Sequence, residues 1–181
     1  VSLVQPGMTV GLGTGDTAAY AIKALAARKL DGLCCVATST RSADLARELG
    51  LPLLELDDLG PSMAGSTQPI AITIDGADEI DGSLQLSKGG GGALLFEKLV
   101  AQASRQMVVI ADEQKVVKTI GDARPLAIEV VSFGAQHTLA RITQLPQIKS
   151  AQLRRAAQSD ALFRTDSGHF IVDAQLQLDA S

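Results

Sequence analysis

The sequence predicts an α/β protein, with a mostly parallel sheet over residues 1–125 and a smaller α+β unit over residues 126–181. In the first part, short apolar runs alternate with segments of helical periodicity, which is typical of parallel sheets. After Gly121 this pattern changes. Hydrophobic residues make up 46% of the chain and aromatic residues only 3%. The core must therefore be aliphatic, as in strands that helices cover on both faces.

The elements of the first part follow from the spacing of apolar residues and from glycine stops. Ala18, Ile22 and Leu25 recur at helical spacing, and Gly50 ends a second helical pattern. Strands are expected at Met8–Leu12, Leu33–Ala37, Leu53–Leu56, Ile70–Ile74 and Met107–Ala111. Helices are expected at Thr17–Arg28, Ser42–Leu49, Gly92–Ser104 and Gln114–Ile120. The stretch Gly60–Pro69, rich in Gly, Ser and Pro, is expected to be a loop.

The second part predicts one strand, one helix and a hairpin. Leu126–Val131 has the composition of a strand, and Gln136–Gln144 has helical spacing. Phe163–Thr165 and Phe170–Leu176 flank a turn at Asp166-Ser167-Gly168, so we expect them to pair as a hairpin.

Charge and cysteine content exclude several classes of protein. The net charge is −4, and no run of Lys or Arg suggests a nucleic-acid or membrane surface. Cys34 and Cys35 are adjacent within an apolar run, so we interpret them as buried strand residues and not as a disulfide or metal site. No signal peptide or apolar span of membrane length is evident, and a cytoplasmic protein is expected.

The segment Gly11–Thr17 lies between an expected strand and an expected helix. Glycines there let the backbone approach a ligand, and a helix N-terminus offers unpaired N–H groups to an anion. It lacks the third glycine of the dinucleotide fingerprint and the Gly-Lys-Ser/Thr of the P-loop. Phosphate binding and a simple tight turn both remain open from the residues alone.

Asp75-Gly76-Ala77-Asp78-Glu79-Ile80-Asp81 follows the apolar run Ile70–Ile74 directly. Open α/β sheets place their ligand sites at the carboxyl ends of strands, where these acids are expected. A polar turn or a cation site are the alternatives, although the segment has fewer regularly spaced oxygen ligands than a divalent-metal loop needs.

Lys88-Gly89-Gly90-Gly91-Gly92 precedes a helix that contains Glu97. Four consecutive glycines are costly to order, and they suit a loop whose backbone N–H groups face one ligand oxygen. A flexible linker is the alternative. Lys115 follows another strand, where a lone Lys is more often a solvated side chain. A carboxylate base, a Lys and a loop of N–H donors suit proton transfer on a small anionic substrate.

Together these blocks resemble, in order and spacing, those of the ribose-5-phosphate isomerase A family. The resemblance rests on Gly11–Thr17, the Asp75–Asp81 segment and the run from Lys88 to Lys98. It extends to Ile110-Ala111-Asp112 with Lys115, to Pro125–Val130, and to Thr165–Gly168 with Ile171–Asp173. It covers nearly the whole chain.

The resemblance implies a Rossmann-like first domain, a homodimer or homotetramer, a sugar-phosphate substrate, and no metal or redox cofactor. It implies Glu97 as the catalytic base, with Asp75, Asp78 and Lys88 as further catalytic residues. The implied substrate-binding residues are Thr14, Gly15, Asp16, Thr17, Gly76, Ala77, Gly89, Gly90, Gly91 and Lys115.

Some positions depart from the family pattern. Asp16 stands where Ser is usual, Phe96 stands where a polar residue is usual, and the loop at Gly60–Pro69 is longer than usual. The chain begins close to the first strand and ends soon after Asp173, which predicts a shortened member or a fragment. A non-catalytic sugar-phosphate-binding module is the alternative function. A relative of the coenzyme A transferases is disfavoured, because the Lys88–Gly92 block matches the isomerases better.

Overall fold

The structure of the chain is a computed structural model that describes residues 1–60, 69–157 and 159–177. The chain divides into two compact units. Unit 1 comprises Val1–Gly76 and Leu95–Ala111, and unit 2 comprises Ala77–Leu94 and Asp112–Ser181. The units interleave along the sequence, and the expected division into two domains at residue 125 stays a prediction.

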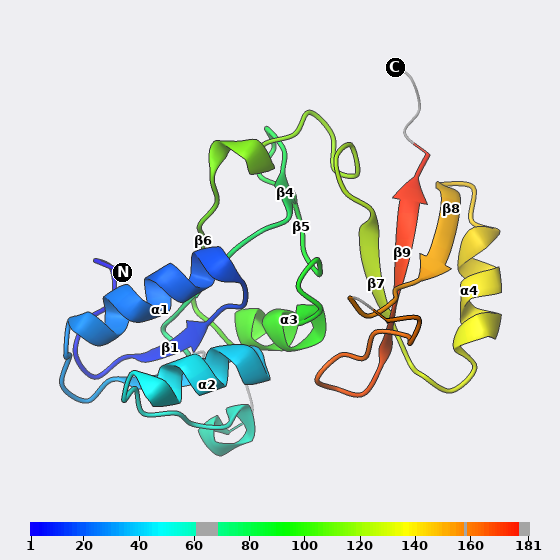
Figure 1. The fold of residues 1–181 in the computed structure, drawn as a ribbon. Coiled ribbons are helices and arrows are strands. Elements are labelled where there is room, and N and C mark those ends of the chain that lie inside the picture. Colours follow the sequence, from blue (N-terminus) through cyan, green and yellow to red (C-terminus); the bar gives the residue numbers. More distant parts are fainter. Residues whose placement is uncertain (61–68, 158, 178–181) are drawn as a thin grey trace. The chain divides into compact units, whose positions relative to one another are not determined.

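Unit 1 is built on a parallel sheet of four strands (Figure 1). The strands are β1 (Thr9–Leu12), β2 (Cys34–Ala37), β3 (Ile72–Asp75) and β6 (Met107–Val109), in the order β2-β1-β3-β6. The chain moves from β1 to one side and then returns to the other, so the order reverses between β1 and β3. Ligands of open α/β sheets bind beyond the strand ends at such a switch point.

Three helices cover this sheet: α1 (Asp16–Ala27), α2 (Thr40–Glu48) and α3 (Leu94–Gln102). Alternate residues of each strand face opposite sides. Val10 and Leu12 of β1 therefore pack in a cluster with α1, while Gly11 between them faces α3. A Cβ at Gly11 would lie 1.9 Å from Thr73 Oγ1 and 2.7 Å from a methyl carbon of Val100, so only glycine fits there.

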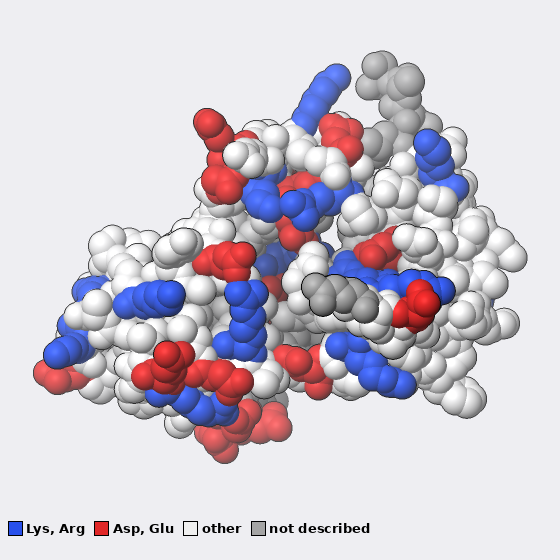
Figure 2. Space-filling model, viewed as in Figure 1, with Lys and Arg blue, Asp and Glu red and all other residues white. Residues whose placement is uncertain are grey.

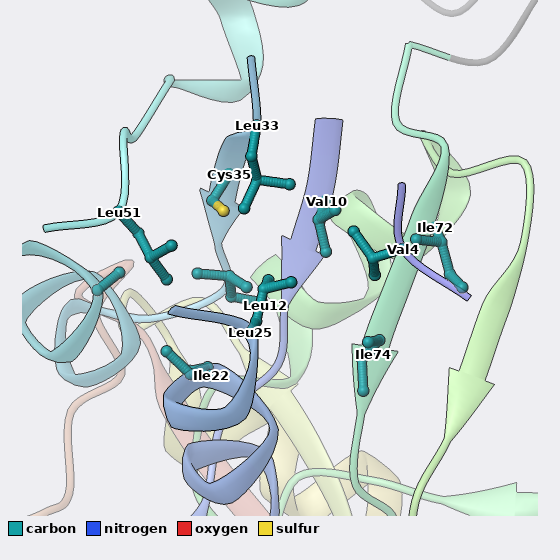
Figure 3. Close-up of a cluster of buried hydrophobic side chains, with 11 residues drawn as sticks. Val4, Val10, Leu12, Ile22, Leu25, Leu33, Cys35, Leu51, Ile72 and Ile74 are labelled. Atoms are coloured by element: carbon teal, nitrogen blue, oxygen red, sulfur yellow. The ribbon is translucent and has the colours of Figure 1, made fainter. Parts of the chain in front are cut away.

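Figure 3 shows the aliphatic cluster between the sheet and α1. Ile22 and Leu25 lie on the face of α1 that meets the strands, four and seven residues after Ala18 on the same buried face. Its labelled members are Val4, Val10, Leu12, Ile22, Leu25, Leu33, Cys35, Leu51, Ile72 and Ile74. A second cluster on the α3 side contains Val36, Ile70, Val100 and Ala103. These two clusters confirm the aliphatic core that the composition predicts.

Unit 2 contains an antiparallel sheet of three strands in the order β7-β9-β8. The strands are β7 (Leu126–Val130), β8 (Ile148–Leu153) and β9 (Phe170–Leu176), and α4 (Ala135–Thr143) packs against β8. A short hairpin of β4 (Glu79–Ile80) and β5 (Leu86–Ser87) also belongs to this unit. The α/β class, with a parallel sheet and a smaller α+β part, is therefore confirmed.

Several sequence expectations were wrong in detail. Strand β8 was missed. Its sequence IKSAQL is rich in polar residues, because only one face of the strand meets the core. The expected hairpin between Phe163–Thr165 and β9 does not form, since β7 and β8 occupy both edges of β9. Instead, Thr165 N donates to His169 O and closes a turn.

Two short elements also differ from expectation. Leu53 forms a single parallel bridge with Cys35, and Leu56–Leu59 is a 3₁₀ helix and not a strand. The helix expected at Gln114–Ile120 is a 3₁₀ turn over Glu113–Lys115. Most of the loop expected at Gly60–Pro69 lies outside the described residues. Within the described ranges, the helices are too short or too polar to cross a membrane.

Candidate active site

The loop after β1 is held directly against the end of β3. Thr14 N donates to Oδ1 of Asp75 over 3.2 Å, and Gly76 N donates to the same oxygen over 2.7 Å. Asp75 is completely buried. A Cβ at Gly13 would lie 2.2 Å from that carboxylate oxygen, so glycine is required for the loop to approach Asp75 so closely. The two loops thus meet at the switch point of the sheet.

A group of hydroxyls fixes Thr14 from the other side. Thr14 Oγ1 lies 2.8 Å from Thr38 Oγ1 and 2.7 Å from Ser39 Oγ. Ser42 Oγ donates to the Gly13 carbonyl over 2.7 Å. Thr38, Ser39 and Ser42 are all buried. The sequence interpretation missed them, although they follow the expected strand Leu33–Ala37 and so belong to the same sheet edge.

The loop at Gly13 and Thr14 continues into α1 through residues that are more exposed. Gly15 caps the helix with a φ of 111°, which disfavours other residues. Asp16 begins the helix and is 85% exposed, with its Oδ1 2.5 Å from Nη2 of Arg41. Thr17 is also exposed. The carboxylate that replaces the usual Ser is thus paired with a cation from α2.

The acids of residues 75–81 each have their own backbone donors. Asp78 Oδ2 accepts from Gly90 N over 2.7 Å. Asp81 Oδ1 accepts from Ser83 N and Gln85 N and so caps the turn between β4 and β5. Each acid of the segment therefore binds a different stretch of backbone, and the acids do not share one ligand site. In the described ranges, His, Cys, Asp and Glu side chains nowhere gather in threes in a way that would hold a metal ion.

Glu79 is the most heavily bonded of these acids. Its side chain is 1% exposed and accepts from the backbone N–H groups of Gly121, Ala123 and Arg124 over 2.7–2.9 Å. Burial by itself raises the pKa of this carboxyl, but the three backbone donors and the Ser87 hydroxyl outweigh it and lower the pKa below its usual value. Glu79 thus stabilises the chain around residue 121, a structural role that the sequence interpretation did not separate from the candidate site.

The glycine loop is an ordered turn and not a linker. Gly92 N donates to Gly89 O, and both residues have positive φ values, 82° and 113°. A Cβ at Gly89 would lie 2.6 Å from Cβ of Ala127, and one at Gly90 would lie 2.5 Å from Oδ1 of Asp78. Packing and backbone conformation therefore require glycine at residue 89, whereas a side chain at residue 90 would displace the Asp78 carboxylate. Gly90 and Gly91 are exposed.

The remaining predicted residues lie apart along the chain, two on helical elements and two in the segments before β4 and after β5. Glu97 is in the first turn of α3 and is only 6% exposed. Lys88 is half-buried immediately before the glycine turn, Ala77 is half-buried beside Asp78, and Lys115 ends the 3₁₀ turn at Glu113–Lys115. Phe96 lines a pocket of unit 1 with Val36, Leu54 and Leu99, among other residues, which accounts for an apolar residue next to Glu97.

The predicted residues fall into two groups. Unit 1 brings together Thr14, Asp75 and Gly76, and it also contains Gly15, Asp16, Thr17 and Glu97. Unit 2 brings together Asp78 and Gly90, and it also contains Ala77, Lys88, Gly89, Gly91 and Lys115. Figure 2 shows acidic and basic side chains interspersed over the visible face, without a large area of one sign.

Comparisons with known proteins identify the family of the chain. The family model described as ribose 5-phosphate isomerase A (phosphoriboisomerase A) matches residues 34–181. The chain is 46% identical over 178 residues to the ribose-5-phosphate isomerase A of Parvibaculum lavamentivorans, with 96% of this chain and 73% of that protein covered. It is 47% identical over 178 residues to the protein of the same name from Agrobacterium fabrum, with 96% and 73% covered.

A solved D-ribose-5-phosphate isomerase in complex with phospho-erythronic acid has the same fold. It is 32% identical, with a TM-score of 0.88 over 98% of this chain and 76% of that chain. The family model matches well over half of the chain, and the curated relatives share nearly half of its residues. The chain therefore belongs to the ribose 5-phosphate isomerase A family.

Proposed function

We propose that this chain interconverts D-ribose 5-phosphate and D-ribulose 5-phosphate through an enediolate. Its relatives bear the name of that activity, and a solved relative binds a phosphorylated sugar acid. The observation that carries the proposal is the buried Asp75 carboxylate at the switch point of the sheet, where it orders the Thr14 loop. That loop and α1 supply the backbone N–H groups that suit a phosphate.

The central step moves one proton from C2 of the open-chain aldose to C1. Glu97 is proposed as the base that takes this proton and returns it to C1, and its burial supports the assignment because bulk water cannot easily exchange the proton. The electron pair of the C2–H bond forms the C1–C2 double bond, and the π pair of the carbonyl moves to the oxygen on C1, which gives the enediolate. Lys88 and the N–H groups of the glycine loop are proposed to stabilise the negative charge on that oxygen.

A second proton moves from the C2 hydroxyl to the oxygen on C1. Asp78 suits this transfer and the opening of the sugar ring better than Asp75 does. Asp78 is half-buried and therefore accessible, whereas Asp75 is completely buried and accepts two backbone N–H groups on one oxygen. Asp75 is accordingly proposed to position the Thr14 loop. Thr14, Gly15, Asp16 and Thr17 are proposed at the phosphate, with Gly76, Ala77 and Lys115 as further substrate contacts.

The proposal is tested by incubating the purified chain with ribose 5-phosphate in D₂O and following the products by NMR. We expect ribulose 5-phosphate with only partial deuterium at C1, because the buried Glu97 should return most of the substrate proton before it exchanges with solvent. A calorimetric titration with the same substrate runs in parallel. Binding without turnover would instead support the non-catalytic sugar-phosphate-binding module. Assembly into dimers or tetramers and a cytoplasmic location stay part of the proposal, and sedimentation would measure the former.

A further inference from the structure

Arg154 binds the glycine loop at residues 89–92, and no part of the proposed mechanism uses this side chain. Its Nη1 donates to Gly89 O over 2.8 Å and to Gly90 O over 3.2 Å. Its Nε and Nη2 donate to the two oxygens of Asp173 at 2.5–3.2 Å. The side chains of Arg154 and Asp173 are only 16% and 17% exposed. A bidentate ion pair of this kind fixes the orientation of the guanidinium plane as well as the position of its charge.

The glycine loop also makes packing contacts with the small sheet of unit 2 and with residues next to it. Asp173 lies on β9, opposite Ala127 of β7, and Gly89 packs so closely on Ala127 that a Cβ at residue 89 would lie 2.6 Å from the Ala127 Cβ. Gly92 packs similarly against the ring of Phe163, and Arg154 lies 5.8 Å from the centre of that ring. The sheet and the segments next to it therefore pack against the turn, with Arg154 as the polar contact.

The carbonyl contacts determine where the amide groups point. In a trans peptide unit the C=O and the N–H of the next residue point in opposite directions. Since Gly89 O faces Arg154, Gly90 N–H must point away from it, and that group donates to Asp78. By the same geometry, the contact of Gly90 O with Arg154 turns the N–H of Gly91 away from the guanidinium.

We propose that Arg154, held by Asp173, is a positioning residue for the isomerase reaction. It orients the peptide units of Gly89 and Gly90 so that Asp78 and the Gly91 N–H are ordered before the substrate arrives. This inference rests on the proposed function, in which Asp78 transfers the hydroxyl protons and the glycine loop stabilises the enediolate. A donor that is already oriented needs no reorientation during the reaction. If the donor becomes disordered, we therefore expect kcat to fall more than KM rises.

The test compares Arg154→Met with Arg155→Met, a matched control one residue further along the chain. Arg155 is 63% exposed, and within the described part of the chain its guanidinium contacts Asp160 alone. We expect Arg154→Met to lower kcat about 10- to 100-fold, the range that a misplaced catalytic group produces, with KM changed less than about threefold. Arg155→Met is expected to stay within about twofold of the wild type, since it is an exposed position.

Two further measurements separate positioning from a loss of folding. Millimolar guanidinium should restore part of kcat in Arg154→Ala but leave Arg155→Ala unchanged, because a free guanidinium ion can occupy the space beside Asp173. Asp173→Asn keeps the shape of the pair and should show an intermediate loss of kcat. If Arg154→Met keeps the kcat of the control, or if its loss appears entirely in KM, the inference is wrong.

Amide hydrogen exchange tests the role of Arg154 independently of the proposed isomerase activity. Exchange at residues 89–92 should be about tenfold faster or more in Arg154→Met than in Arg155→Met, with or without turnover, because the local opening that exposes these amides becomes easier. A wild type without isomerase activity would overturn the proposed function, whereas unchanged exchange in Arg154→Met would overturn the role of Arg154.

Discussion

The backbone N–H of Thr14 donates to the side chain of Asp75 over 3.2 Å, although 61 residues separate them in the chain. The bond joins the loops after β1 and β3 at the point where the strand order reverses. Gly13 makes the approach possible, since a side chain there would overlap Asp75. The affinity of this loop for phosphate is therefore expected to depend on a residue that has no polar side chain.

Gly13→Ala tests this dependence. The added Cβ would lie 2.5 Å from Cα of Asp75, so a side-chain rotation cannot relieve the overlap. We expect the free energy of unfolding to fall by about 2–3 kcal/mol, as for an overpacked core, and turnover to be lost. Urea denaturation measures the first effect. The control is Gly82→Ala, where the new Cβ meets nothing within 4 Å and the change should stay within about 0.5 kcal/mol.

Glu97→Gln should abolish turnover while substrate affinity stays within a few-fold of the wild type. An amide has nearly the shape of the carboxylate but cannot accept the proton, and loss of a general base typically costs about 10²–10⁴ in rate. Steady-state kinetics and calorimetric titration measure the two quantities. Retention of more than about a tenth of the wild-type rate would remove Glu97 from the role of base, because such a loss is smaller than that range.

The pair of Asp16 and Arg41 should set the affinity for the phosphate. Asp16→Ser removes a like charge near the proposed phosphate position and releases Arg41, so we expect binding of ribose 5-phosphate to tighten about tenfold at low salt. The gain should shrink at higher salt, since both side chains are exposed. Arg41→Met, which leaves Asp16 without its cation, should weaken binding instead. Equal dissociation constants for Asp16→Ser and the wild type at both salt levels would mean that Asp16 does not face the phosphate.

Glu79 should make stability depend on pH in the acid range. Its pKa is lowered in the folded chain, so the unfolded chain binds the proton more readily. Its contribution is therefore complete above the unfolded pKa of about 4.5 and is lost as the pH falls through the lower folded value. Glu79→Gln should destabilise the chain by about 1–3 kcal/mol at pH 7, and the difference from the wild type should narrow below about pH 4. Thermal unfolding over this pH range measures it, with Glu48→Gln on an exposed part of α2 as the control.

Treatment with a metal chelator should leave turnover unchanged. Asp78, Glu79 and Asp81 direct carboxylate oxygens at backbone N–H groups within unit 2, so their oxygens are already engaged as acceptors. Assays before and after exhaustive dialysis against EDTA test this. Activity that disappears and returns with one added divalent metal would instead point to these acids as ligands.

The sequence was sufficient for the parallel sheet because each strand there is a short apolar run that is followed by glycine, hydroxyl or acidic residues. Gly11–Thr17 and Asp75–Asp81 each follow such a run, so their position at one sheet edge could be predicted from the order of the strands. Strand β8 could not be predicted in the same way. Only Leu153 of its six residues is buried, so its sequence has little apolar periodicity.

The contacts that order the candidate site were less predictable. Arg154 and Asp173 are 19 residues apart and become partners only because β8 and β9 pair in one register. Glu79 and Gly121 are separated by 42 residues, and no local pattern relates them. The residue types in the motifs indicated proton transfer on an anionic substrate. Which acids support the fold and which remain available for catalysis depends on contacts between distant segments, and the sequence does not show these.

The interleaved composition of the two units has a consequence for synthesis on the ribosome. The polypeptide passes from one unit to the other after Gly76, after Leu94 and after Ala111. Strand β6 at Met107–Val109 must emerge before β3 gains its second parallel neighbour, so the first sheet is incomplete when β3 leaves the exit tunnel. The glycine turn at residues 89–92 gains its contact with Arg154 later still, because Arg154 and Asp173 are translated more than 60 residues after it. The nascent chain must therefore carry the glycine turn without these contacts until residue 173 has been synthesised.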